Sequence, residues 1–158
     1  MKQLMKLNAR VFGESFLDQC DERIAAFYQF WKSKCVAGRI PARGDIDPAE
    51  MVLFLPGITM VNVAPVSQEL TYRLVGTNEV MMRGNDPTGM RVKDNFLAND
   101  WSDVWSYYGH VINNKGIAYD NSDMPKPNGK IIGDETIFLP LSADGEIVDI
   151  VLLYSVQK

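Results

Sequence analysis

The chain has 158 residues, a length that suits one domain with a core of its own. Hydrophobic residues make up 46% and charged residues 23%. The net charge of −4 at pH 7, with no cluster of lysines and arginines, disfavours direct binding to nucleic acid, which needs a basic face. There is no apolar run of about 18 residues for a membrane span and no signal-peptide core near the start, so we expect a cytoplasmic protein without a membrane span.

A long helix is predicted over residues 15–36, because apolar side chains recur there at steps of three and four residues. Such a stripe must be buried, either against the rest of the domain or against a second copy of the helix. Cys20 and Cys35 both fall within this helix, and a rise of about 1.5 Å per residue places them roughly 22 Å apart. That distance excludes a disulfide between them, so we expect two thiols in a reducing compartment.

The next stretch, "GRIPARGDIDPAE" over residues 38–50, combines arginines, aspartates and prolines. An aspartate followed by proline is typical of the first positions of a helix, so a short helix capped by Asp47 is predicted. The arginines can pair with the neighbouring aspartates, which favours a structural joint; an anion or partner site built on the arginines is the alternative. The residues of this motif are Arg39, Pro41, Arg43, Asp45, Asp47 and Pro48, together with Arg73 from a later strand.

Two strands are predicted over residues 58–63 and 70–75, followed by a short helix over 78–83 that ends at Gly84. Arg73 alternates with Tyr72 and Leu74, so we expect it to face away from them and toward the aspartates of the motif.

The second half of the chain contains a predicted helix over residues 99–114 and then three strands over 116–121, 133–141 and 146–156. Asp144 and Gly145 mark the hairpin between the last two strands. The final strand is apolar on both faces, which is typical of a strand covered on both sides. The N-terminal helix is the best candidate for the second cover.

The order of these elements is that of a PAS domain, and two segments resemble a family more closely. "FWKSKCVAGRIPARGDIDPAEM" and "YRLVGTNEVMMRGNDPTG" resemble the single-domain PAS-like proteins of alphaproteobacteria, with the likeness extending over roughly residues 28–96. The resemblance implies an α+β, PAS-like fold with a five-stranded antiparallel sheet and helices on one face. We therefore expect an N-terminal helical extension over residues 1–37 and a PAS-like domain over 38–158.

PAS domains mostly bind small ligands or mediate dimerisation and signalling, so the resemblance implies a non-enzymatic sensor or regulatory module. Its partners would be an unidentified small molecule, another protein, or a second copy in a homodimer. The alternative is a small α+β enzyme with a cone-like pocket, an isomerase or hydrolase that uses a carboxylate. A sensor should lack ionisable groups that converge in its cavity, and this separates the two hypotheses.

The chemistry of the sequence predicts no catalytic residue, metal site or cofactor. Its one histidine, His110, has no nucleophile motif beside it, and neither zinc-ligand spacing nor a phosphate-binding loop occurs. Haem is disfavoured because His110 lies roughly 160° from the centre of the apolar stripe of its helix. Flavin photochemistry of the light-oxygen-voltage kind needs a cysteine just before that helix, and both cysteines lie far upstream.

Large apolar side chains of the second half can line the space between the helices and the sheet. Such residues suit an apolar ligand, but they equally suit a filled core. Buried tryptophan and tyrosine need polar partners, so an interior rich in them also suits water or a polar ligand group. We expect Trp105 to be buried against the sheet. The candidate pocket residues are Met81, Met82, Phe96, Trp101, Trp105, Tyr108 and Phe138.

Overall fold

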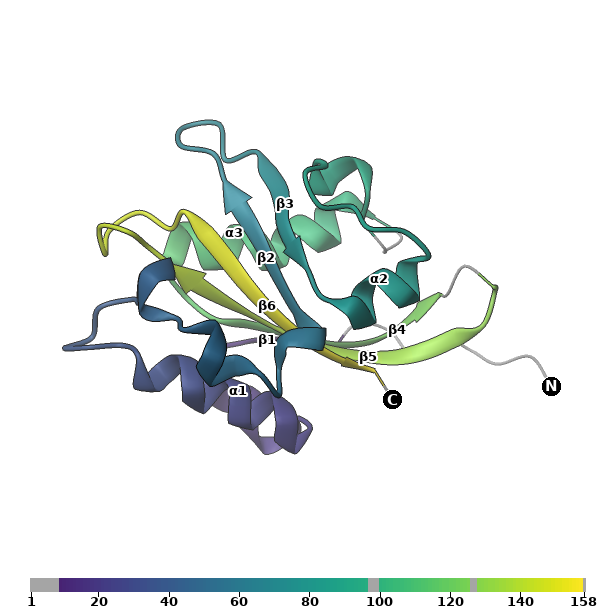
Figure 1. Cartoon of the computed structure of the whole chain (residues 1–158), viewed down its shortest axis with the longest axis horizontal. Helices are drawn as coiled ribbons and strands as arrows, with labels where there is room; N and C mark the ends of the chain where they lie inside the picture. The colour runs from purple at the N-terminus through teal and green to yellow at the C-terminus, as the bar shows by residue number, and fades with distance from the viewer. Residues whose placement is uncertain (1–8, 97–99, 126–127, 158) are drawn as a thin grey trace.

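An antiparallel sheet forms the centre of the molecule (Figure 1). The structure is a computed structural model that describes residues 9–96, 100–125 and 128–157. Within these residues the sheet has six strands in the spatial order β1-β4-β5-β6-β2-β3. In that order they are Ala9–Phe12, Ala118–Pro125, Ile131–Leu141, Ile150–Gln157, Ile58–Val63 and Leu70–Val75.

In the described part of the chain three α-helices cover the sheet, with α1 (Glu22–Ser33) on one face and α2 (Thr77–Arg83) and α3 (Trp101–Asn114) on the other (Figure 1). Short 3-10 turns connect these elements. No helix in the described ranges is both long and apolar enough to cross a membrane. The 3-10 turns are η1 Glu14–Asp18, η2 Arg43–Asp45, η3 Pro48–Met51, η4 Leu55–Gly57 and η5 Val92–Asp94.

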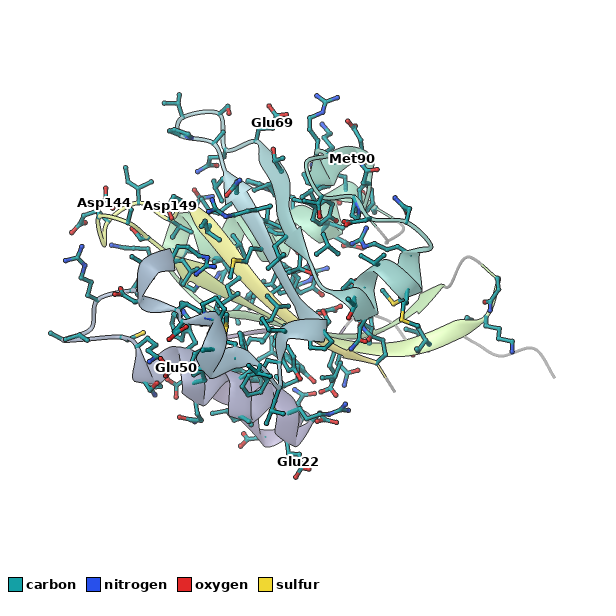
Figure 2. The ribbon with its side chains drawn as sticks, viewed as in Figure 1. Glu22, Glu50, Glu69, Met90, Asp144 and Asp149 are labelled. Atoms are coloured by element: carbon teal, nitrogen blue, oxygen red, sulfur yellow. The ribbon has the colours of Figure 1, made fainter. Side chains whose placement is uncertain are left out.

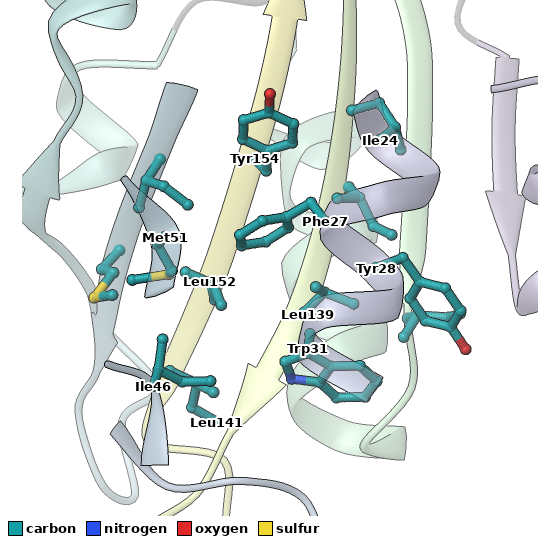
Figure 3. Packing of buried hydrophobic residues seen from close by; sticks show 14 of the residues in the cluster. Ile24, Phe27, Tyr28, Trp31, Ile46, Met51, Leu139, Leu141, Leu152 and Tyr154 are labelled. Atoms are coloured by element: carbon teal, nitrogen blue, oxygen red, sulfur yellow. The ribbon is translucent and has the colours of Figure 1, made fainter. Parts of the chain in front are cut away.

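The core on the α1 face is apolar and rich in aromatic rings (Figure 3). Phe27 of α1 is fully buried and packs against Tyr154 of β6, with ring centroids 4.8 Å apart. The indole Nε1 of Trp31 donates to the carbonyl oxygen of Pro140 at 3.0 Å, which satisfies the polar atom of a buried tryptophan. The prediction that the N-terminal helix covers the second face of the last strand is therefore confirmed, and the helix does so on its own sheet.

The predicted continuous helix over residues 15–36 is wrong at both ends, because the chain breaks it at Asp21 and α1 already ends at Ser33, which leaves Cys20 and Cys35 outside the helix. The Asp21 carboxylate accepts from the backbone N–H of Arg23 and so forms the N-cap of α1. The backbone N–H of Asp21 itself donates to Oε1 of Glu135 at 3.0 Å, a contact with β5 that the helical pattern does not contain. The segment before the break becomes η1, in which Phe16 is still fully buried.

The sheet has one strand more than the five expected. The additional strand, β1, has only four residues and pairs with β4 at the edge of the sheet. Arg10 of this strand forms an ion pair with Asp103 of α3 at 2.9 Å, which ties the added edge to the helix layer. Strands of four residues carry too short an alternation to be found from the sequence.

A β-bulge in β3 changes the direction of Arg73. Met60 of β2 pairs with Leu74 and Val61 pairs with Tyr72, so Arg73 is the extra residue of the bulge. The expected alternation over residues 72–74 is therefore wrong: Tyr72 is buried, whereas Leu74 is 41% exposed. Arg73 donates to the side-chain oxygen of Asn62 at 3.4 Å instead of reaching the aspartates of the motif.

Candidate functional site

Within the motif of residues 38–50, Asp47 is the residue predicted to cap a short helix. Oδ1 of Asp47 accepts from the backbone N–H of Ala49 at 2.9 Å, so the predicted N-cap is confirmed, with Pro48 at the first position of η3. Glu50 points away from this cap and pairs with Lys34 at 2.9 Å. The first turn of η3 is thereby tied to the end of α1.

The other motif residues also contact the protein itself. The Asp45 carboxylate accepts from the backbone N–H of Ala42 at 2.9 Å, and the Arg43 guanidinium donates to the carbonyl of Ile46 at 2.9 Å. These contacts support a structural joint between α1 and the sheet.

The same joint reaches the β5–β6 loop. Pro41 is buried, and its carbonyl accepts from the backbone N–H of Ser142 at 3.0 Å. Arg39 lies against Gly145, where a Cβ atom would meet the Arg39 Nε at only 2.6 Å. The motif therefore holds the loop of residues 142–149 beside the end of α1.

The sheet face under α2 and α3 carries two rows of polar side chains, which we call the polar rows. Strand register places Asp120, Thr136 and Ser155 side by side, and the next row on that face holds Ser122, Asp134 and Gln157. The row on the other side, Ala118, Phe138 and Leu153, is apolar and belongs to the core under α3. The side chains on the α2 and α3 face of the sheet thus change from apolar in the row of Phe138 to polar in the two rows beside it.

Asp134 is the centre of the hydrogen bonds in the polar rows. Its Oδ1 accepts from the side-chain amide of Gln157 at 2.7 Å, and its Oδ2 accepts from the Thr136 hydroxyl at 3.1 Å. The Thr136 and Ser155 hydroxyls are 2.7 Å apart. Asp134 is only 5% exposed, so these bonds replace water around a buried carboxyl group.

Helix α2 closes one end of the polar rows. Glu79 is 6% exposed and lies near Arg83, with Nε 3.7 Å from Oε2, and its Oε1 accepts from Gln157 at 3.4 Å. Arg83 also donates to the Tyr72 hydroxyl at 3.0 Å and to the Asn95 carbonyl at 2.7 Å. A single guanidinium therefore joins α2 to β3 and to the residues after η5.

Helix α3 closes the other end through Tyr107. Its hydroxyl donates to Oδ1 of Asp120, and the Ser122 hydroxyl donates to Oδ2 of the same carboxylate at 2.7 Å. The Tyr107 ring also stacks on Phe138, with centroids 5.0 Å apart and planes at 7°. Tyr107 thus bridges the apolar row and the polar rows.

Burial raises the pKa values of all three carboxyl groups in this cluster. The pKa of Asp134 rises to about 7, first because it is buried and then because the Glu79 carboxylate lies nearby. The pKa of Glu79 is also raised by burial, against the opposing charge of Arg83, and that of Asp120 is raised by burial against its two hydroxyl donors. Near pH 7 the cluster can therefore hold a proton.

The seven candidate pocket residues separate into three groups. Met82, Tyr108 and Phe138 are buried and fill the core, where the Tyr108 ring meets Phe138 edge-on at 5.4 Å. Met81 is 79% exposed, so its assignment to a pocket is wrong, because it lies on the outer face of the short helix α2. The third group, Phe96, Trp101 and Trp105, is partly buried.

The third group forms an aromatic row at the start of α3. The rings of Phe96 and Trp101 are 5.5 Å apart, and those of Trp101 and Trp105 are 6.3 Å apart. Trp105 packs against the core but is only partly buried, less than expected, because Tyr107 and Tyr108 occupy the sheet-facing side of α3. The tryptophans lie one helical turn apart at the border of that side.

The two tryptophans line an open groove of about 490 Å³, which we call the tryptophan groove. Its other walls come from the start of β3 and from the segment around η5. Figure 2 marks Glu69 at this end of β3 and Met90 on the neighbouring segment, whose carbonyl accepts from the backbone N–H of Tyr72 at 3.0 Å. The lining residues are Ser67, Gln68, Glu69, Leu70, Arg91, Lys93, Trp101 and Trp105.

His110 lies away from the polar rows. Its ring is half-buried and stacks on Phe12 of β1 with centroids 4.2 Å apart, and its Nδ1 is 3.1 Å from the Asn114 amide. The histidine is therefore less exposed than the helical pattern indicated. In the part of the chain that the structure describes, no group of three histidine, cysteine or acidic side chains is arranged to hold a metal ion.

The polar rows and the charged rim of the groove were missed from the sequence. A signal was present in alternate polar residues of three strands: Asp120 and Ser122, Asp134 and Thr136, Ser155 and Gln157. This alternation became informative only with the strand register, which aligns the three pairs.

An antiparallel sheet of this order, with helices inserted between its two halves and packed on one face, defines the class of PAS-like sensor and regulatory domains. The chain belongs to the PAS domain family, because a family model described as "PAS domain" matches residues 21–153. That match begins within the first helical region of the chain. No curated protein matches the chain.

A similar solved structure is described as "Structure of an RNA-binding Light-Oxygen-Voltage Receptor". It is 15% identical, with a TM-score of 0.51 over 73% of this chain. This chain covers 35% of that protein, so the likeness shows the shared fold and nothing of the receptor's other parts.

Proposed function

We propose that this PAS domain is a non-enzymatic sensor or regulatory module that binds a small molecule in the tryptophan groove. The observation that carries the proposal is the groove itself, with about 490 Å³ of space and two half-buried indole rings in its wall. Concave sites of about 300–1,000 Å³ with aromatic walls and a few polar groups are typical of small-molecule binding. A ligand seated there would remove more of both indoles from water, which favours binding.

Helix α3 offers a route from the groove to the interior. It carries Trp101 and Trp105 in the groove wall, and two residues after Trp105 it carries Tyr107, which donates to the buried Asp120. A ligand that shifts α3 therefore also changes a hydrogen bond in the polar rows. In this proposal α3 would be the two-state element that a sensor requires.

The signal would pass to a partner protein or to a second copy in a homodimer. Val52 and Leu53, which follow the structural joint, are 62% and 91% exposed and offer apolar contact area. We place this activity in the cytoplasm, in keeping with the two unpaired thiols of Cys20 and Cys35.

An enzyme that uses a carboxylate is the second candidate, and the raised pKa of Asp134 favours it. Ionisable groups do converge in the polar rows, which is the feature that separates the two hypotheses. However, both Asp134 oxygens are engaged by Gln157 and Thr136, and the residue is 5% exposed. A substrate could not reach this carboxylate without opening the domain, so the sensor is the better supported function.

Native mass spectrometry of freshly purified full chain tests the proposal, since it reports retained ligand and oligomeric state together. We expect a retained small molecule, or a change in tryptophan emission when a compound library is added to Trp31→Phe protein. In that variant only the groove tryptophans emit, since the chain has three tryptophans. Small-molecule binding in the groove would be refuted if the mass spectrum shows protein without a ligand and no compound changes the tryptophan emission of the variant.

A further inference from the structure

We infer that the tryptophan groove selects a planar aromatic compound that carries a negative charge, as an aromatic carboxylate or sulfonate does. This inference rests on the proposed small-molecule function and adds the chemical class of the ligand. Three features of the groove carry it: the shape of its aromatic wall, an uncompensated cation on its rim, and its size.

The aromatic wall suits a flat ligand. Trp101 and Trp105 are adjacent on α3, with ring centroids 6.3 Å apart and planes at 34°. The Phe96 ring packs against Trp101, with ring centroids 5.5 Å apart. An aromatic ring gains most from such surfaces by stacking on one indole while its edge meets the other.

The lining of the groove carries two cations, Arg91 and Lys93, and one anion, Glu69. Arg91 is engaged by Asp94 at 2.7 Å and by Glu69 at 3.8 Å. Among the described residues, Lys93 has no ion-pair partner, and it is exposed at the groove. Lys93 is therefore the charge on the rim that is available to pair with an anionic ligand, in a chain whose net charge of −4 gives no general attraction for anions.

The size of the groove limits the ligand to a small molecule. One end is formed by the β2–β3 turn, where the Gln68 side-chain amide donates to Asn113 of α3 at 2.9 Å and fixes the turn against the helix. Leu70, which is buried, adds an apolar floor. A volume of about 490 Å³ accommodates one or two fused rings with a charged substituent.

A pair of fluorescent probes tests the charge preference on the full chain. Anilinonaphthalene sulfonate is an anion with a planar fused-ring group, and N-phenylnaphthylamine has the same ring system without the sulfonate. We expect one sulfonate probe per chain, bound about fivefold or more tightly than the neutral compound at low salt, with the advantage declining as ionic strength rises.

Lys93→Gln should weaken the sulfonate about fivefold and leave the neutral probe unchanged, since it removes one exposed charge from the rim. Lys130→Gln is the control: it removes one exposed positive charge in the β4–β5 turn, outside the groove, and should leave the affinity for both probes unchanged. Trp105→Ala should weaken both probes, with circular dichroism and the unfolding midpoint showing that each variant is folded.

The inference is overturned if the neutral probe binds as tightly as the sulfonate, or if both lysine variants weaken the sulfonate equally. In either case binding that still depends on Trp105 leaves the proposed function standing. If neither probe binds the folded protein, the inference and the groove as a small-molecule site both fall.

Discussion

Replacing Asp134 with asparagine tests the buried polar rows most directly. An amide is close in shape to a protonated carboxyl group: its oxygen can accept from Gln157, and its nitrogen can donate to the Thr136 hydroxyl. The variant therefore keeps the packing and both hydrogen bonds while it removes the negative charge. The difference in free energy of unfolding between the variant and the parent, followed over pH, then reports on that charge.

The expected magnitude follows from the pKa of Asp134, which burial raises from 3.8 to about 7. A raised pKa means that the folded state holds the proton more tightly, so the stabilisation is complete below pH 4 and is lost as the pH rises to about 7. Three pKa units correspond to about 4 kcal/mol, and coupling to Glu79 divides the effect between the two groups. Asp134→Asn should therefore stabilise the fold by about 2–4 kcal/mol at pH 8 and by little at pH 4.

Urea unfolding from pH 4 to pH 8.5, followed by tryptophan fluorescence, measures this difference. Asp144→Asn is the matched control of opposite sign, because backbone N–H donors of Ile147 and Glu146 lower the pKa of Asp144 to about 2. Its replacement should reduce stability throughout this range. The reasoning is wrong if Asp134→Asn is less stable than the parent at pH 8 and its free energy of unfolding changes with pH in the same way as that of the parent. The buried carboxylate would then be stabilised in its charged form.

Three further results are expected. Asp47→Ala should reduce the free energy of unfolding by about 0.5–2 kcal/mol, because it removes the acceptor for the Ala49 N–H; an unchanged urea midpoint would contradict the capping role. Phe27→Ala should cost about 3–5 kcal/mol, whereas Trp105→Ala should cost clearly less because Trp105 is only half-buried, and equal losses in urea unfolding would contradict the core assignment. Protein expressed with added haem should show no Soret band, and a stoichiometric band that disappears in His110→Ala would overturn the expectation that no haem is bound.

The elements that local chemistry controls could be predicted from the sequence. Strands β2 and β3 and the end of α2 at Gly84 lie where hydrophobic alternation and turn residues placed them. The cap at Asp47 and the cover of the last strand by α1 followed from residue type and from apolar periodicity. These features depend on neighbours in the chain, which a single sequence contains.

The features that were missed depend on contacts between distant residues. The break before α1 involves a bond from Asp21 to Glu135, and the bulge at Arg73 is a mismatch between two strands. The sheet-facing side of α3 is set by Phe138, which selects Tyr107 in place of Trp105 as the inner residue. The spacing of apolar residues in a helix shows how wide its apolar stripe is. Which edge of that stripe is buried depends on the sheet surface against which the helix packs.

The two faces of the sheet differ in the groups that they bury. On the α1 face the buried side chains are mostly apolar and aromatic, and the structural joint of residues 38–50 holds that face in place. On the opposite face the central strands bury Asp120 and Asp134, although apolar side chains of similar volume would often stabilise a fold more than buried charged groups do. Tyr107 links these buried groups to the helix that lines the tryptophan groove, and this link supports our proposal that the domain responds to a ligand bound there.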